Sequence, residues 1–298
     1  MAEWGICTTV KAPLIEVEAF VAHHLSLGAS QIWLHFDDPD DPAIPAISSV
    51  LGVTAVRCDA DYWVDNGGKR PPRIEGRQSA NIRRVYKSGL LPWVAHIDID
   101  EFIHPVTHVG AALDQIDADD PIVRMRPWEA LYAPVTDFPF APGLFRAPIR
   151  PATVPLLFDR LFGDYSPLME RGSLSHAAGK AFYRSGVEGL RPKIHTARLK
   201  GRPSTGYPFN DDLRLLHFHA QNKTAWINAL PRRLKSGSYG GAPAMADFLA
   251  HATADQINAF YDAVMMNNAK WEQSCRKRDL LIEVDLNLPA KVANLRQP

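Results

Sequence analysis

Apolar residues along the first third of the chain recur in short runs that alternate between two spacings. Runs rich in β-branched and aromatic residues occupy 6–10, 31–36 and 53–57, and each is followed by polar residues, as expected of buried strands. Between the first two runs, apolar residues over 14–25 recur at helical spacing and stop before Gly28. This strand–helix–strand order predicts an α/β fold whose parallel strands are joined by right-handed crossovers.

A fourth run, 93–102, is apolar at first and gains carboxylates only toward its end. One strand over these residues would put Asp98 and Asp100 on the same face, together with His96. Two buried like charges are costly unless a cation or hydrogen bonds compensate them, so the pattern predicts a divalent metal site. Oxygen ligands favour Mn²⁺ or Mg²⁺ over zinc. The alternative to a metal site is that one of the two aspartates caps the next turn and the other is exposed to solvent.

The rest of the chain predicts fewer strands and more helices. An extended segment at 213–219 places His217 and His219 on one face, and either is a candidate metal ligand or a core histidine. We favour His219 as the ligand because it lies closer to the end of the strand. Further predictions are a short helix at 46–51, a loop at 63–76, helices at 77–87 and 109–116, a strand at 122–126, and helices at 223–230 and 244–276.

The polar stretch 236–241 is predicted to be a linker. It divides the chain into a sheet domain, 1–235, and a helical extension, 236–298. The chain has 298 residues, which is long enough for either one large domain with an extension or two modest ones.

Composition narrows the class of partner. The 33 Lys+Arg and 33 Asp+Glu give a net charge of +0, so no chain-wide field draws nucleic acid, and none is expected as a partner. The three cysteines have no CxxC spacing, which favours a reducing compartment. No signal peptide or long apolar run is present, so we predict a cytoplasmic protein with at most peripheral contact with the inner face of the membrane.

The charges are nevertheless sorted into patches. Acidic residues gather at 37–41 and 98–101. Basic residues gather at 73–84 and at 191–202, and the second basic cluster ends with Arg202. The basic clusters are either solvated faces or contacts for phosphates, an acidic acceptor or lipid headgroups.

The segment WVAHIDIDEFIHP at 93–105 resembles the D-x-D-E-F segment of bacterial glycosyltransferases related to family 2, the Glyco_tranf_2_4 type with a GT-A fold. Other pieces agree in order over about 5–235: TTVKAP, the FVAHHLSLGASQIWLHFDDPDDP stretch, the Arg77-Gln78 pair with Asn81, GKAFYR and LHFHA. The resemblance implies a Rossmann-like mixed sheet flanked by helices, followed by the helical extension.

The resemblance also implies roles for individual residues. Asp98 and Asp100 would hold the metal, with His219 or His217 completing its shell. The implied donor-binding residues are Thr9, Lys11, Asp37, Asp38, Arg77, Gln78, Asn81 and Lys180. This chain reads Lys11-Ala12-Pro13 where many relatives read Lys-Asn-Glu, so only backbone contacts to the nucleotide base are expected there.

The function predicted from this resemblance is metal-dependent transfer of a sugar from a nucleoside diphosphate to a polysaccharide or lipid-linked acceptor. UDP is the favoured nucleotide and GDP the alternative. The candidates for the general base are the carboxylates that follow the metal segment, Glu129, Asp137, Asp159, Asp164 and Glu170. We name Asp164 because Gly163 beside it suggests an exposed turn. Two other classes stay open: a phosphohydrolase with an Asp nucleophile, although no Thr lies two residues after Asp100, and a non-catalytic nucleotide- or glycan-binding protein.

Overall fold

The computed structural model describes residues 1–150, 152–203 and 207–297. The chain forms two compact units that interleave along the sequence. The first unit comprises residues 1–126, 178–215 and 287–298, and the second comprises 127–177 and 216–286. Both units draw residues from either side of position 235.

A mixed β-sheet forms the centre of the first unit. Its parallel part has the order β4-β1-β2-β3. On the other side of β4, β8 pairs antiparallel with β4, and β6 pairs antiparallel with β8. The bounds are β1 (Trp4–Val10), β2 (Gln31–Phe36), β3 (Val53–Arg57), β4 (Trp93–His96), β6 (Ile122–Ala130) and β8 (Lys180–Arg184). The helix-flanked mixed sheet confirms the predicted α/β fold class.

Helices cover the sheet of the first unit, and α4 packs on β1 and β4. The bounds are α1 (Leu14–Ser26), α2 (Ala43–Ser48), α3 (Ala60–Asp65), α4 (Ile74–Ser88), α5 (Val109–Asp114) and α11 (Leu288–Leu295). The prediction of a loop at 63–76 is wrong at both ends, because α3 and α4 extend into it. Asp59 caps α3 by accepting a hydrogen bond from the Tyr62 backbone N–H at 2.8 Å.

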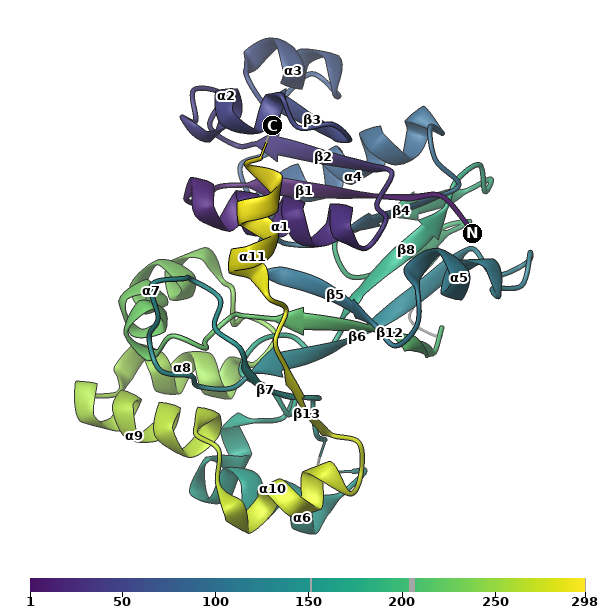
Figure 1. Ribbon diagram of the computed structural model, residues 1–298. Helices are drawn as coiled ribbons and strands as arrows, with labels where there is room; N and C mark the ends of the chain where they lie inside the picture. The colour runs from purple at the N-terminus through teal and green to yellow at the C-terminus, as the bar shows by residue number, and fades with distance from the viewer. Residues whose placement is uncertain (151, 204–206, 298) are drawn as a thin grey trace. The chain divides into compact units, whose positions relative to one another are not determined.

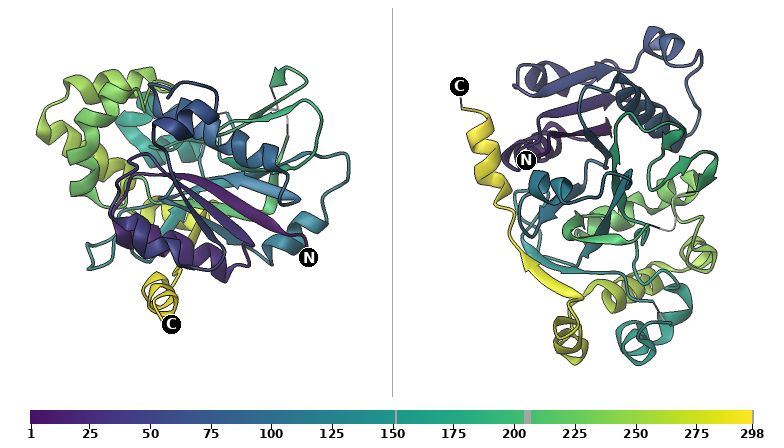
Figure 2. Two further views of the ribbon diagram at one scale, coloured as in Figure 1. Left: turned by 90° about the horizontal axis from the view of Figure 1, so that it is seen from above. Right: turned by 90° about the vertical axis from the view of Figure 1, so that its right-hand side faces the viewer.

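The helix α11 runs beside α1, although the two lie at opposite ends of the chain (Figures 1 and 2). Arg296 Nε donates to Glu18 Oε1 at 2.8 Å, and Lys291 Nζ lies 3.0 Å from His23 Nδ1. His23 Nε2 in turn bonds to the backbone oxygen of Ile103 at 2.7 Å. These contacts attach the end of the chain to the first unit.

The prediction of a single strand at 93–102 is also wrong. The chain leaves β4 after His96, makes a turn, and enters β5 (Glu101–Pro105), so Asp98 and Asp100 lie in a turn rather than on a strand face. The Glu101 backbone N–H donates to the Asp98 carbonyl at 3.0 Å and closes this turn. The turn still follows the carboxyl end of β4.

Smaller extended elements complete the first unit. β12 (Phe209–His217) pairs with β5 and β6, and its last two residues belong to the second unit. A separate antiparallel sheet has the order β11-β10-β9, with bounds β9 (Leu190–Pro192), β10 (Ala197–Leu199) and β11 (Arg202–Pro203). The side chain of Arg202 lies outside the described part of the structure.

The second unit packs helices around aromatic side chains that include Trp226, Phe260, Tyr261 and Trp271. It also has a strand that was not predicted, β13 (Leu281–Val284), which pairs antiparallel with β7 (Gly143–Arg146). The helices are α6 (Pro155–Phe162), α7 (Lys223–Ser236), α8 (Pro243–His251), α9 (Ala254–Met265) and α10 (Ala269–Arg276), with a 3₁₀ turn η1 (Gly163–Leu168). No helix in the described residues is long and apolar enough to cross a bilayer.

Candidate functional site

A buried ion cluster lies where β8 meets the turn after β4. The Lys180 ammonium lies 2.6 Å from Asp98 Oδ2 and 3.4 Å from Glu101 Oε2. The side chains of Lys180 and Glu101 are fully buried, whereas 29% of the Asp98 side chain is exposed. We call these three residues the ion triad. It places two carboxylates and one ammonium close together at one end of β8.

Hydrogen bonds fix the orientation of the Asp98 carboxylate. Gln78 Nε2 on α4 donates to Asp98 Oδ1 at 2.6 Å, and Lys180 donates to Oδ2. The Asp98 backbone N–H donates to Glu101 Oε2 at 2.7 Å, which shapes the turn. Each oxygen of Asp98 therefore has a donor at a short distance, and the carboxylate points in one direction.

Burial and charge act in opposite directions on the triad. Burial is the largest single influence and raises the pKa of the Asp98 carboxyl, but the charge of Lys180, its hydrogen bond and the neighbouring His96 and His195 together outweigh burial, so the net pKa lies below its ordinary value. Burial lowers the pKa of Lys180, but Asp98 and Glu101 together raise it above its ordinary value. Asp98 is thus an anion and Lys180 a cation at neutral pH. Burial, and then the charge of Lys180, lower the pKa of the neighbouring His96 to about 3, so His96 is neutral.

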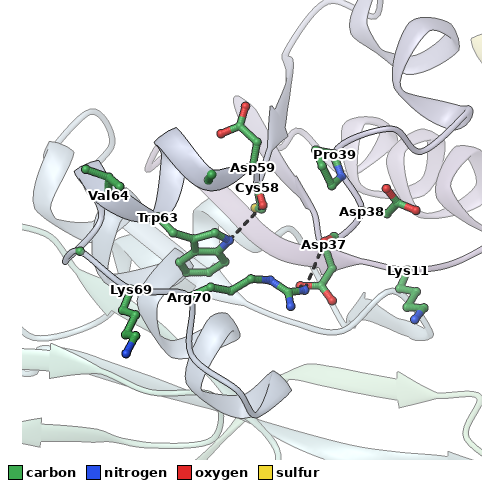
Figure 3. A pocket seen from close by; sticks show the side chains of 12 residues that line it. Lys11, Asp37, Asp38, Pro39, Cys58, Asp59, Trp63, Val64, Lys69 and Arg70 are labelled. Atoms are coloured by element: carbon green, nitrogen blue, oxygen red, sulfur yellow. Dashed lines mark hydrogen bonds and ion pairs between the residues drawn. The ribbon is translucent and has the colours of Figure 1, made fainter.

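A cavity of about 700 Å³ opens at the carboxyl ends of β1, β2 and β3 (Figure 3). This edge is where open parallel sheets bind ligands. We call it the donor cavity, because Lys11, Asp37 and Asp38, which were predicted to bind the donor, line it. Its lining includes three cations, Lys11, Lys69 and Arg70, three carboxylates, Asp37, Asp38 and Asp59, and the apolar surface of Trp63. The Trp63 indole N–H donates to the Cys58 carbonyl at 2.9 Å, which fixes the plane of the ring.

Asp37 is held in the wall of this cavity by two arginines. Arg77 binds it through two parallel hydrogen bonds, Nε to Oδ1 at 2.6 Å and Nη2 to Oδ2 at 3.0 Å. Arg70 Nη2 donates to Oδ1 at 2.9 Å, a contact visible in Figure 3. Only 7% of the Asp37 side chain is exposed. The carboxylate therefore positions Arg70 at the cavity.

Two other residues predicted to bind the donor lie between α4 and β1. Asn81 Nδ2 donates to Thr9 Oγ1 at 2.8 Å, and Asn81 Oδ1 accepts from the Tyr62 hydroxyl at 2.7 Å. Both Asn81 and Thr9 are buried. In the structure these side chains hold α4 on the sheet. Lys11 and Asp38 line the donor cavity, and the predicted contacts of all four with a donor stay predictions.

The predicted histidine ligands belong to the second unit. His217 is buried, and its ring lies 4.9 Å from that of His176 and 5.3 Å from that of His219. His219 Nε2 lies 3.1 Å from the Tyr239 hydroxyl and 3.3 Å from Arg233 Nη1. Burial, followed by the charge of Arg233, lowers the pKa of His219, which is therefore neutral. A neutral imidazole is the form that binds a metal.

Asp164, the predicted general base, is also in the second unit. It lies on η1, is exposed, and lines a cavity of about 320 Å³ together with Asp262. Asp262 is paired with Lys223 at 2.6 Å. The role of Asp164 stays a prediction.

Several residues of the site were missed in the sequence. Glu101 was counted in the acidic patch at 98–101 but was given no role of its own, although a carboxylate beside the apolar residues Phe102 and Ile103 is a usable signal because, once buried, it must find a partner. Asp59 follows β3 in the way that Asp37 follows β2, so it could have been found by the same reasoning. Lys69 and Arg70 lie in an irregular segment after α3, and no pattern pointed to them.

Comparison with known proteins gives weak similarities only. No family model matches the chain, and no curated protein matches it. A solved structure of CMP:2-keto-3-deoxy-manno-octonic acid synthetase complexed with CTP matches 43% of this chain and 53% of its own, at 13% identity and a TM-score of 0.27. HddC from Yersinia pseudotuberculosis matches 46% of this chain and 65% of its own, at 10% identity and a TM-score of 0.29. The chain thus spans between half and two thirds of the length of these two proteins.

A third structure matches nearly the whole chain. S. aureus TarS 1-349 in complex with UDP-GlcNAc covers 98% of this chain and 79% of its own, at 7% identity and a TM-score of 0.37. The donor cavity and the ion triad carry the functional interpretation.

Proposed function

We propose that this protein is a metal-dependent glycosyltransferase that takes a sugar from a nucleoside-diphosphate donor, with UDP favoured over GDP. One observation carries the proposal: two consecutive residues of α4 connect the donor cavity to the turn after β4. Arg77 binds Asp37 in the cavity wall, and Gln78 binds Asp98 in the turn. A single helix thus contacts both Asp37 in the wall of a nucleotide-sized cavity and Asp98 in the turn after β4.

The chemistry of the donor cavity suits a nucleoside diphosphate. The exposed Val64 and the edge of the buried Trp63 offer apolar contacts for a base, and Lys11, Lys69 and Arg70 offer positive charge for a diphosphate. The carboxylates of Asp38 and Asp59 can accept hydrogen bonds from the base or the ribose hydroxyls. A volume of about 700 Å³ is within the range of small-molecule sites.

We further propose that Asp98 and Asp100 hold a Mn²⁺ or Mg²⁺ ion, with His219 or His217 retained as the predicted third ligand. Carboxylate oxygens match these cations, and Lys180 keeps Asp98 ionised, which a ligand requires. When bound, such a cation stabilises the negative charge that develops on the leaving diphosphate. Gln78 and Lys180 orient the Asp98 carboxylate and each occupy one lone pair of its oxygens, so a cation would bind through the remaining lone pairs. A polysaccharide or lipid-linked acceptor, with Asp164 as its base, completes the proposal.

The test combines binding with turnover. A thermal-shift screen of UDP, GDP, CDP and their sugars, each with and without Mn²⁺, should raise the melting temperature for one nucleotide through ligand-linked stabilisation. Donor hydrolysis or transfer should then fall by at least about 100-fold in Asp98→Asn and in Asp100→Asn, because the charge stabilisation is lost. Asp119→Asn, an exposed aspartate outside the site, is the matched control. Activity within a few-fold of wild type in both site variants would exclude the metal assignment.

A further inference from the structure

A second cavity in the first unit is lined by cations. It has a volume of about 380 Å³ and lies between α4 and β9, two elements that pack against each other. Arg83, Arg84 and Lys87 reach it from α4, and Arg191 reaches it from β9. We call it the basic pocket. It shares no lining residue with the donor cavity.

In the part of the chain that the structure describes, the cations of the basic pocket have no acidic partner at ion-pair distance. No carboxylate lines the pocket, and none of its four cations forms an ion pair within the described residues. Arg83 Nε donates to the Ser79 carbonyl at 2.8 Å, and the Arg84 guanidinium lies 5.0 Å from the centre of the Tyr62 ring. These contacts orient the two guanidinium groups but leave their charge uncompensated.

This arrangement costs stability unless an anion is present. Arg83 and Lys87 are four residues apart on α4, a spacing at which like charges repel. Arg191 on β9 lies directly opposite Arg198 on β10, and like charges facing each other across a strand pair also repel. The chain as a whole is neutral, so the excess of positive charge is local to this face. Repulsive contacts retained in one place are typical of a binding site.

We propose that the basic pocket binds the phosphate group of a second ligand, distinct from the donor. Arginine matches phosphate because its guanidinium donates two parallel hydrogen bonds to two phosphate oxygens. Three arginines and one lysine around about 380 Å³ can neutralise a phosphate ester while the buried Leu190 and Tyr86 form an apolar floor. The phosphate is carried either by a soluble molecule or by a lipid headgroup. The site does not depend on the proposed transferase activity.

The experiment measures phosphate binding with matched charge removal. Tripolyphosphate is titrated calorimetrically into the wild type and into Lys87→Gln/Arg191→Gln, both of whose residues are exposed, so the fold should be kept. Two controls each remove the same charge elsewhere: Lys11→Gln/Lys69→Gln in the donor cavity, and Lys270→Gln/Lys277→Gln on exposed positions of the second unit. We expect the basic-pocket variant to lose about ten-fold or more in affinity, since two charge-assisted contacts are removed. The second-unit control should stay within about two-fold of the wild type, and the donor-cavity control should keep the affinity of the basic pocket, losing at most a separate binding event at Lys11 and Lys69.

A second arm separates the two sources of phosphate. Sedimentation with vesicles containing about 30% phosphatidylglycerol in phosphatidylcholine tests binding to headgroups. Vesicle binding that is lost in Lys87→Gln/Arg191→Gln assigns the site to a lipid headgroup, and binding of tripolyphosphate alone assigns it to a soluble phosphate. The proposal is overturned if the wild type binds neither probe, or if the second-unit control weakens binding as much as the basic-pocket variant. It is also overturned if only the donor-cavity control loses affinity. Each of these results leaves the transferase test unaffected.

Discussion

Acid should destabilise this protein through histidines that the fold holds neutral. His24, His35 and His96 are buried in the first unit, with at most 1% of each residue exposed. Burial lowers the pKa of His24 to about 3 and that of His35 to about 4. Burial and the charge of Lys180 lower the pKa of His96 to about 3. In the unfolded chain each ring should titrate near its ordinary value of about 6.5.

The sign and size of the effect follow from proton linkage. Because the unfolded chain binds more protons below about pH 6.5, the free energy of unfolding falls as the pH falls through that value. A pH of 5 lies about 1.5 units below the pKa of each ring in the unfolded chain, so the ring is protonated there and neutral in the folded protein. One pH unit corresponds to about 1.4 kcal/mol, so each histidine lowers the free energy of unfolding by about 2 kcal/mol. The three together give about 6 kcal/mol, which is comparable with the whole stability of a typical domain.

The assay is urea unfolding at pH 8 and pH 5, followed by far-UV circular dichroism. The free energy of unfolding should be about 6 kcal/mol lower at pH 5. His35→Gln is the matched variant, because it keeps a polar side chain and removes one titrating ring. Its difference between the two pH values should be smaller by about 2 kcal/mol. Equal stability at the two pH values, or NMR signals of these rings that titrate near pH 6.5 in the folded protein, would refute the reasoning.

Two further predictions concern single buried contacts. Lys180→Met leaves the fully buried Glu101 carboxylate without its cation, so we expect a loss of about 3 to 5 kcal/mol in urea unfolding, part of which the double variant with Glu101→Gln should restore. An unchanged midpoint for the single variant would show that the cation is not needed. At Gly172, where φ is +70°, a Cβ atom would lie 1.8 Å from the Ile149 carbonyl oxygen. Gly172→Ala should therefore lower the melting temperature far more than Gly67→Ala, which has a positive φ but open space around it; similar shifts for the two would contradict the steric reasoning.

The strands of the parallel sheet could be predicted because they are short runs rich in β-branched and aromatic residues; β1 and β2 are buried along their length, whereas β3 is only partly buried. The run 31–36 became β2 and the run 53–57 became β3 with the same bounds. The break between β4 and β5 could not be predicted in this way, because apolar residues continue across it at Ile97, Ile99 and Phe102. The break depends on the Glu101 side chain, which accepts a hydrogen bond from the Asp98 backbone, a contact that no periodicity encodes.

The residues of the site could be predicted from the sequence, but which of them form ion pairs with each other could not. Asp37 and Arg77 were both expected near a donor, yet their mutual salt bridge joins positions 40 residues apart and depends on how α4 packs. Lys180 was expected to meet phosphates, whereas its ammonium is paired with Asp98 and Glu101. Local sequence specifies which groups are present, and tertiary packing decides which of them neutralise each other.

The pairing of α1 with α11 has a consequence for the order in which the chain becomes structured during synthesis. The contacts between Arg296 and Glu18 and between Lys291 and His23 span 278 and 268 residues. A ribosome makes α1 early, but its partner helix emerges only after all residues of the second unit have been translated. Contacts of such high sequence separation are slow to form because a long loop must close first. We therefore expect the surface of α1 that α11 covers to stay exposed until translation has passed residue 295, which makes it a target for chaperones in the nascent chain.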